Sequence, residues 1–189
     1  MFNTLTVVIL TLYFLSSFNR IKTTIYGLVP KSRRRVSLLG DEILSRVGGY
    51  VGGAFTIALI AGSTSLIRVY GWGVPYPLAL ALIVASTDII PLIGATIGAV
   101  IASATALFVS IPVGIATAVF YLAYQQIENC LIYPRVMNKT VDVNPAAAIV
   151  GVPIGGAIFG VVGALLAIPV TAAIALILRE VIAPRLDQA

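Results

Sequence analysis

The stretch Asp88-Ile89-Ile90-Pro91-Leu92-Ile93-Gly94 decides the fold, because it interrupts a long apolar region. Asp88 is the only charged residue between residues 69 and 127. Pro91 lacks a backbone N–H and disfavours helical geometry at the residue before it, while Gly94 adds backbone freedom. The stretch therefore predicts a helix, a bend and a return helix over residues 77–110.

The composition around this stretch is that of a membrane protein. Of 189 residues, 59 % are hydrophobic and 10 % are charged, with a mean hydropathy of +1.05. Soluble domains carry roughly a quarter charged residues. The chain has no His and a single cysteine, Cys130, which excludes an internal disulfide, His-based acid–base chemistry and His metal sites. We expect an all-α, polytopic integral membrane protein that is not an enzyme and needs no cofactor or metal.

Charge-free runs divide the chain into expected elements. A spanning helix needs about 20 mostly apolar residues. The runs predict a single membrane domain, 1–189, with helices at 1–19, 47–70 and 113–132, broken hairpins at 77–110 and 145–178, and a tail at 179–189. In the second hairpin, breaks are expected at Pro153–Gly156 and near Gly160–Gly163.

Basic residues predict the orientation of the chain. Seven of the twelve lie in the segment 20–46, which reads from Pro30 as an amphipathic helix. We expect this segment to be cytoplasmic and to lie on the anionic inner leaflet; a solvated connector is the alternative, and nucleic-acid binding is not expected. The predicted topology puts eleven basic residues and the C-terminus in the cytoplasm and only Arg68 outside.

The same topology makes the two hairpins enter the membrane from opposite sides. Aligning Pro91 with Pro153 gives five identities in the ten positions PLIGATIGAV and PIGGAIFGVV. Paired, Gly/Pro-interrupted segments of opposite entry are typical of alternating-access transporters, whose broken tips frame a substrate site. The alternative is a pair of kinked helices packed through small residues.

Polar residues near the expected tips are the candidate ligands for a small polar solute or a monovalent cation. Asp88 is costly in a bilayer and is expected to bind cargo; the alternative is that it caps a broken helix or lies at the membrane interface. Gln125, Glu128 and Asn129 share one helical face, although Glu128 has the alternative of pairing with Arg135. The predicted substrate and ion site comprises Asp88, Pro91, Gly94, Gln125, Glu128, Asn129, Gly155 and Gly156.

Several segments in this order resemble the autoinducer-2 exporter family, the PerM-type permeases. The matching segments are LVPKSRRR (28–35), YVGG (50–53), IPLIG (90–94), QQIEN (125–129), YPRVM (133–137) and GGAIFGVVGALLAIP (155–169). The matching motif residues are Pro91, Gly94, Glu128, Asn129, Pro134, Arg135, Gly155, Gly156, Gly160, Gly163 and Pro169.

The resemblance implies a prokaryotic inner-membrane transporter without ATPase parts. Family members are described as exporters of autoinducer-2 and some as sodium/proton antiporters, which implies ion-coupled movement of a small polar solute or signal molecule. Members are usually near twice this length. The alternatives are therefore a non-transporting structural or regulatory subunit, or a fragment of a transporter. Small residues at four-residue spacing make a homo-oligomer a further expectation.

Overall fold

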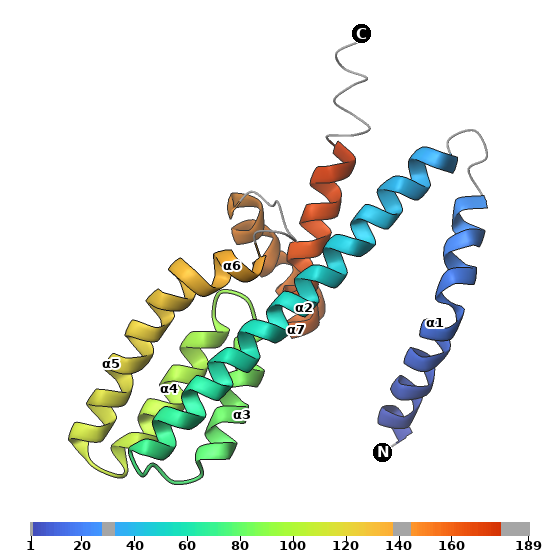
Figure 1. Cartoon of the computed structure of the whole chain (residues 1–189). Coiled ribbons are helices and arrows are strands. Elements are labelled where there is room, and N and C mark those ends of the chain that lie inside the picture. The colour runs from blue at the N-terminus through green and yellow to red at the C-terminus, as the bar shows by residue number, and fades with distance from the viewer. Residues whose placement is uncertain (1, 28–32, 138–144, 179–189) are drawn as a thin grey trace. The chain divides into compact units, whose positions relative to one another are not determined.

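The computed structural model describes residues 2–27, 33–137 and 145–178, and within these ranges every regular element is a helix (Figure 1). The all-helical prediction is confirmed. The elements are α1 (Phe2–Gly27), α2 (Arg33–Gly71), α3 (Pro77–Asp88), α4 (Gly94–Leu107), α5 (Ile111–Ile127), the π-helix η2 (Glu128–Ile132), α6 (Tyr133–Met137) and α7 (Pro145–Ile177). The chain divides into two compact units, residues 1–42 and 43–189.

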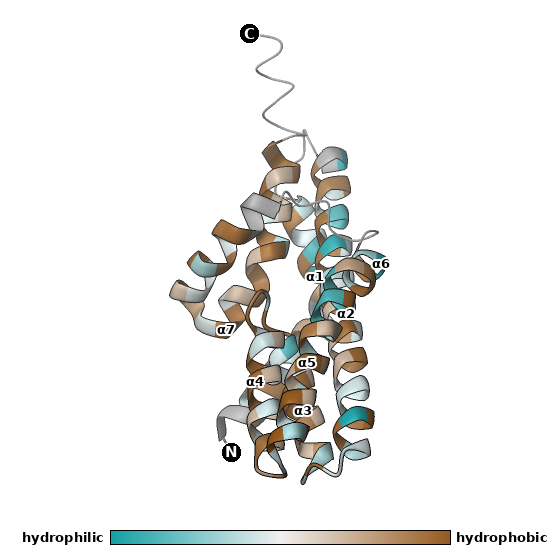
Figure 2. Ribbon diagram, turned by 90° about the vertical axis from the view of Figure 1, so that its left-hand side faces the viewer, coloured by the Kyte–Doolittle hydropathy of each residue, from teal (hydrophilic) through white to brown (hydrophobic). Residues whose placement is uncertain are grey.

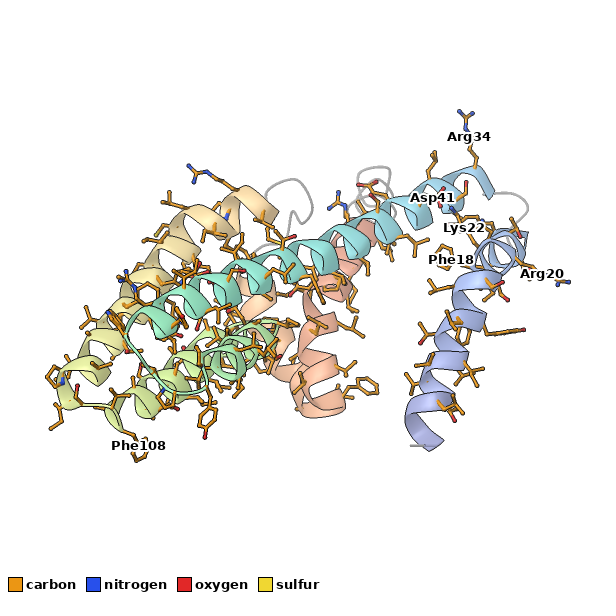
Figure 3. All side chains as sticks on the ribbon, turned by 60° about the horizontal axis from the view of Figure 1, so that its bottom comes forward. Phe18, Arg20, Lys22, Arg34, Asp41 and Phe108 are labelled. Carbon is orange, nitrogen blue, oxygen red and sulfur yellow. The ribbon has the colours of Figure 1, made fainter. Side chains whose placement is uncertain are left out.

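The first unit consists of α1 and the start of α2. Lys22 on α1 forms an ion pair with Asp41 on α2, and Tyr26 donates a hydrogen bond of 3.0 Å to the same carboxylate (Figure 3). The sequence predicts a separate basic segment at 20–46, but α1 continues to Gly27 and α2 runs unbroken from Arg33 into the expected span. The glycines after residue 46 lower helix propensity without ending the helix, because Gly costs only about 1 kcal/mol in a helix interior. Pro30 lies outside the described residues.

In the second unit, the C-terminal part of α2 packs with α3, α4 and α5. One buried cluster takes one residue from each helix: Ala61, Val84, Ala102 and Tyr121. Ser65 on α2 and Tyr121 on α5 share a buried hydrogen bond. Small side chains therefore let four helices approach closely around one apolar axis.

The α3–α4 hairpin is held together by close backbone approach. Leu92, in the turn between the helices, adopts a left-handed conformation with φ of 71°. A Cβ at Gly94 would overlap the Thr87 carbonyl, so only glycine fits there. The conformation of the turn thus depends on the left-handed backbone of Leu92 and on the close contact at Gly94.

The helix α7 also folds back on itself. Phe159 and Gly160 have non-helical backbone angles, and Gly160 has φ of 61° and ψ of −144°, which suits glycine. Beyond this turn, Gly163 lies against Gly155 so closely that a Cβ on either would overlap the other's carbonyl. The two arms, 145–158 and 161–177, are therefore antiparallel.

The predicted break at Pro153–Gly156 is wrong, because α7 continues through it. Proline has a helical φ and removes only one hydrogen bond, whereas the angles at Gly160 are incompatible with a helix. The second predicted break, near Gly160–Gly163, contains the glycine of the reversal. Pro91 lies in a turn and Pro153 lies within a helical arm, so the aligned prolines hold different positions in the two hairpins.

The hairpins point in opposite directions within the second unit. In Figures 1 and 2 the α3–α4 turn points upward and the α7 turn points downward, toward the middle of the unit. Figure 2 shows both arms of α7 to be largely apolar. The ends of α3 and α4 away from their turn lie with the Arg68 end of α2, and both ends of α7 lie at the opposite end of the unit.

Three described helical segments are long and apolar enough to cross a membrane: Leu5–Gly27, Val36–Gly71 and Ile149–Ile177. The last contains the reversal at Phe159–Gly160. With 12 and 14 residues, α3 and α4 are about 18 and 21 Å long, shorter than the ~30 Å hydrocarbon core.

Candidate functional site

A cavity of about 340 Å³ lies where the α3–α4 turn meets the other helices of the second unit. Its walls come from α2, the α3–α4 turn, α5, η2, α6 and the second arm of α7. The lining residues are Tyr50, Ala54, Ile57, Asp88, Ile89, Ile90, Pro91, Leu92, Ala95, Gln125, Glu128, Asn129, Tyr133, Met137 and Ile168. The turn of one hairpin and an arm of the other therefore contribute to one cavity.

Two carboxyl groups line this cavity from different elements. Asp88 is the last residue of α3, and Glu128 is the first residue of η2. Glu128 is only 6 % exposed, and neither its Oε2 atom nor Asp88 Oδ2 has a hydrogen-bond partner among the described residues. Buried charged oxygens without partners carry a large desolvation cost, so these two atoms are available to an incoming ligand.

The capping alternative for Asp88 and the ion-pair alternative for Glu128 do not match the geometry. The residue at the N-cap of α4 is Ile93, not Asp88, and it makes no side-chain capping bond. Arg135 is exposed, and no ion pair joins it to Glu128 in the part of the chain that the structure describes. The Tyr124 hydroxyl lies close to the Glu128 carboxyl group without forming a hydrogen bond of normal geometry.

Gln125 connects two walls of the cavity. Its Nε2 donates a hydrogen bond of 3.2 Å to the Thr96 hydroxyl on α4. This bond fixes the amide and ties α5 to the helix that follows the α3–α4 turn. The carbonyl oxygen of the amide remains an additional acceptor at the cavity.

The π-helix η2 explains why residues of α5, η2 and α6 all line the same cavity. Gln125, Asn129, Tyr133 and Met137 are four residues apart, and a regular α-helix would rotate the last about 120° away from the first. In η2 the Tyr133 N–H donates to the Glu128 carbonyl, five residues back. The extra residue in this turn cancels about 100° of that rotation, which leaves all four facing the cavity.

Five of the predicted site residues line this cavity: Asp88, Pro91, Gln125, Glu128 and Asn129. The other three are elsewhere. Gly94 is buried inside the α3–α4 hairpin, while Gly155 and Gly156 belong to the first arm of α7, where Gly155 contacts the returning backbone. Gly94 and Gly155 thus hold their hairpins closed, and none of the three glycines lines the cavity.

Sequence reasoning missed the aromatic and aliphatic walls. Tyr50, Ile57, Tyr133, Met137 and Ile168 line the cavity and were not predicted as site residues. Tyr50 and Tyr133 open two of the matching segments, YVGG and YPRVM, so the signal was present for them. Ile168 reaches the cavity only through the folding of α7.

Comparisons with known proteins indicate a family of transporters. The family model described as AI-2E family transporter matches residues 1–183. YrrI of Bacillus subtilis, named as a candidate transport protein, is 31 % identical over 88 % of this chain and 48 % of its own length. A candidate transport protein of Mycobacterium tuberculosis is 35 % identical over 74 % of this chain and 38 % of its own length, and YueF of B. subtilis is 27 % identical over 90 % and 46 %.

The chain spans about half the length of these curated relatives, or less. No solved structure matches it. The family model covers nearly the whole chain, and its apolar helices are those of a multi-pass membrane protein. The chain therefore belongs to the AI-2E transporter family.

Proposed function

We propose that this chain moves a small polar solute or signal molecule across the prokaryotic inner membrane through the Asp88–Glu128 cavity. The observation that carries the proposal is the pair of unpartnered carboxyl oxygens in that cavity. Ionisable side chains in membrane domains are expensive and usually mark a substrate or ion pathway. A purely structural domain would gain stability from an apolar residue at Glu128.

In the proposed arrangement, the two hairpins are re-entrant and enter from opposite leaflets. The short lengths of α3 and α4 and the opposite directions of the two turns support this. Irregular backbone at membrane depth is tolerated where it lines a cavity, as the 89–92 segment does. Rocking of one hairpin against the other then exposes the cavity to each side in turn.

The proposed orientation has the C-terminus in the cytoplasm. It is supported by the distribution of basic residues, eleven against one, across the predicted topology. Arg68, the single outer cation, lies against the Trp72 and Phe120 rings at 5.0 and 4.8 Å. Aromatic side chains of this kind are typical of the membrane interface.

Coupling to sodium or protons is the finer part of the proposal. Among the described residues, Asp88 and Glu128 are the only acidic ones that line the cavity, so they are the groups to which a coupling cation would bind. Asp88→Asn is expected to abolish the dependence of flux on the ion gradient, and Glu128→Gln is expected to do the same.

The test is solute flux into proteoliposomes that contain the purified chain, with and without a sodium or proton gradient. Autoinducer-2 is the first solute to test, because of the family membership. Gradient-dependent flux that the Asp88 and Glu128 variants lose would support the proposal. Absence of flux with a range of polar solutes, from a correctly folded chain, would favour a non-transporting structural or regulatory subunit.

A further inference from the structure

The chemistry of the cavity wall also restricts the cargo, on the assumption that the proposed transport function is correct. Polar side chains come from α3, α5 and η2: Asp88, Gln125, Glu128 and Asn129. Aliphatic side chains come from α2, from the α3–α4 turn and from α7, among them Ile57, Ile90 and Ile168. A ligand that fills this space therefore needs a polar part and an apolar part.

The charge of the cavity has one sign. Two carboxylic residues line it, and no Lys or Arg is among the described lining residues. Glu128 is more than nine-tenths buried, and its unpartnered oxygen belongs to a residue of the cavity wall. An anion would meet two acidic side chains without a counter-ion, whereas a cation would give their unpartnered oxygens an opposite charge.

The size and the aromatic lining favour an organic cation over a bare metal ion. A sodium ion in proteins is held by a tight shell of oxygen atoms, whereas this cavity of about 340 Å³ has a largely aliphatic and aromatic wall. Tyr50 and Tyr133 are among its lining residues, and aromatic rings attract ammonium groups. We propose that the cargo site accepts a small alkylammonium ion, with its ammonium group at Asp88 and Glu128 and its alkyl chain against Ile57 and Ile168.

The experiment measures binding of radiolabelled n-butylamine to the purified full chain in detergent at pH 7, where the amine is protonated. Unlabelled n-butylamine, n-butanol and butyrate serve as competitors, since they have similar size and carry positive, zero and negative charge. Butylamine is expected to compete at least about tenfold more strongly than butanol and butyrate. Asp88→Asn combined with Glu128→Gln is expected to lower butylamine affinity by at least about tenfold.

Glu42→Gln is the matched control, because it removes an exposed carboxylate that does not line the cavity. It is expected to leave butylamine binding unchanged. A second comparison, methylammonium against butylammonium, tests the aliphatic wall, and the longer chain is expected to bind more tightly.

Three results would overturn the assignment: equal competition by butanol or butyrate, unchanged binding in the double variant, or displacement by sodium with no dependence on alkyl length. A flux measurement in proteoliposomes separates this inference from the proposed function. Selective amine binding without flux would retain the site and reject transport. Flux of a polar solute without preference for amines would retain transport and reject the alkylammonium assignment.

Discussion

The two hairpins of the second unit reverse the chain direction with different residues at their turns. The α3–α4 hairpin turns through Pro91 and a left-handed Leu92, packs inside a four-helix bundle, and carries Asp88 at its tip. The α7 hairpin turns at Gly160, has no charged residue, and presents Phe159, 74 % exposed, at its tip. Both need a glycine for backbone contact, but only the first brings a charge to the cavity. Glycine contacts therefore set the shape of each hairpin, and the polar chemistry is confined to one.

The largest effect is expected from removing the shared feature, the glycine contacts. Gly94→Val and Gly163→Val place side-chain atoms where the Thr87 and Gly155 carbonyls lie. Each is expected to destabilise its hairpin by about 3 kcal/mol. The measurement is the midpoint of thermal unfolding in detergent for each variant.

Gly156→Ala is the control for these variants, because the nearest atom to a new Cβ, that of Ala164, is 3.8 Å away. It is expected to leave the midpoint nearly unchanged. If Gly163→Val were as stable as Gly156→Ala, the close antiparallel packing of the α7 arms would be wrong.

The second largest effect is expected when a polar group of each hairpin is removed in turn and solute flux is compared. Asp88→Asn in the first is expected to lower solute flux roughly 30-fold, equivalent to about 2 kcal/mol lost from a charged contact. Thr171→Val in the second removes a hydroxyl that donates to the Ala167 and Ile168 carbonyls of its own helix, at 2.8 Å each. Its flux is expected to match that of the unmodified chain. A larger loss in Thr171→Val than in Asp88→Asn would place the cargo at α7.

Sequence reasoning identified the polar residues of the cavity better than its walls. A carboxyl group within an apolar run has a high free-energy cost in a membrane and usually marks a functional site. This reasoning predicts Asp88 from the sequence alone. Glu128 was named as well, but its alternative pairing with Arg135 could be decided only by burial. Helical periodicity placed Gln125, Glu128 and Asn129 on one face, because α5 and the start of η2 are nearly regular there.

The missed residues depend on features that local patterns do not encode. Tyr133 and Met137 face the cavity only because η2 adds a residue to one helical turn, and nothing in a periodicity argument marks such an insertion. Ile168 depends on the antiparallel return of α7. Proline usually interrupts helices, which favours a break at Pro153–Gly156, yet the backbone angle that only glycine adopts easily lies at Gly160, in the second predicted break.

The third effect concerns the π-helix η2. Deletion of Leu131, whose side chain is 46 % exposed, is expected to turn η2 into regular α-helix. Eleven helical steps of about 100° then separate Gln125 from Met137, so Met137, which is 5 % exposed in the structure, is expected to stay on the cavity face. Insertion of one alanine after Leu131 adds a step instead and is expected to rotate Met137 by about 100° away from that face.

With Cys130→Ala as background, Met137→Cys is expected to resist a water-soluble maleimide in the unmodified chain and in the deletion variant, and to react in the insertion variant. Flux is expected to fall about tenfold in the insertion variant alone. Reaction of Met137→Cys in the deletion variant would mean that the extra residue of η2 does not set the orientation of Met137.

The smallest effect is expected at the bond that ties the first hairpin to α5. Gln125→Leu and Thr96→Val each remove one side of the 3.2 Å hydrogen bond, which lies at a partly exposed position. A double-mutant cycle on the free energy of unfolding is expected to give a coupling of about 0.5–1.5 kcal/mol between the two residues. The matched control pair is Gln126→Leu combined with Thr96→Val, because Gln126 is exposed on the same helix and lies outside the cavity. Its expected coupling is near zero.

Because Gln125 also lines the cavity and Thr96 does not, Gln125→Leu is expected to reduce flux more than Thr96→Val does. Equal losses of flux would mean that the amide acts only by holding α4 against α5, and that the cavity takes no ligand contact from Gln125.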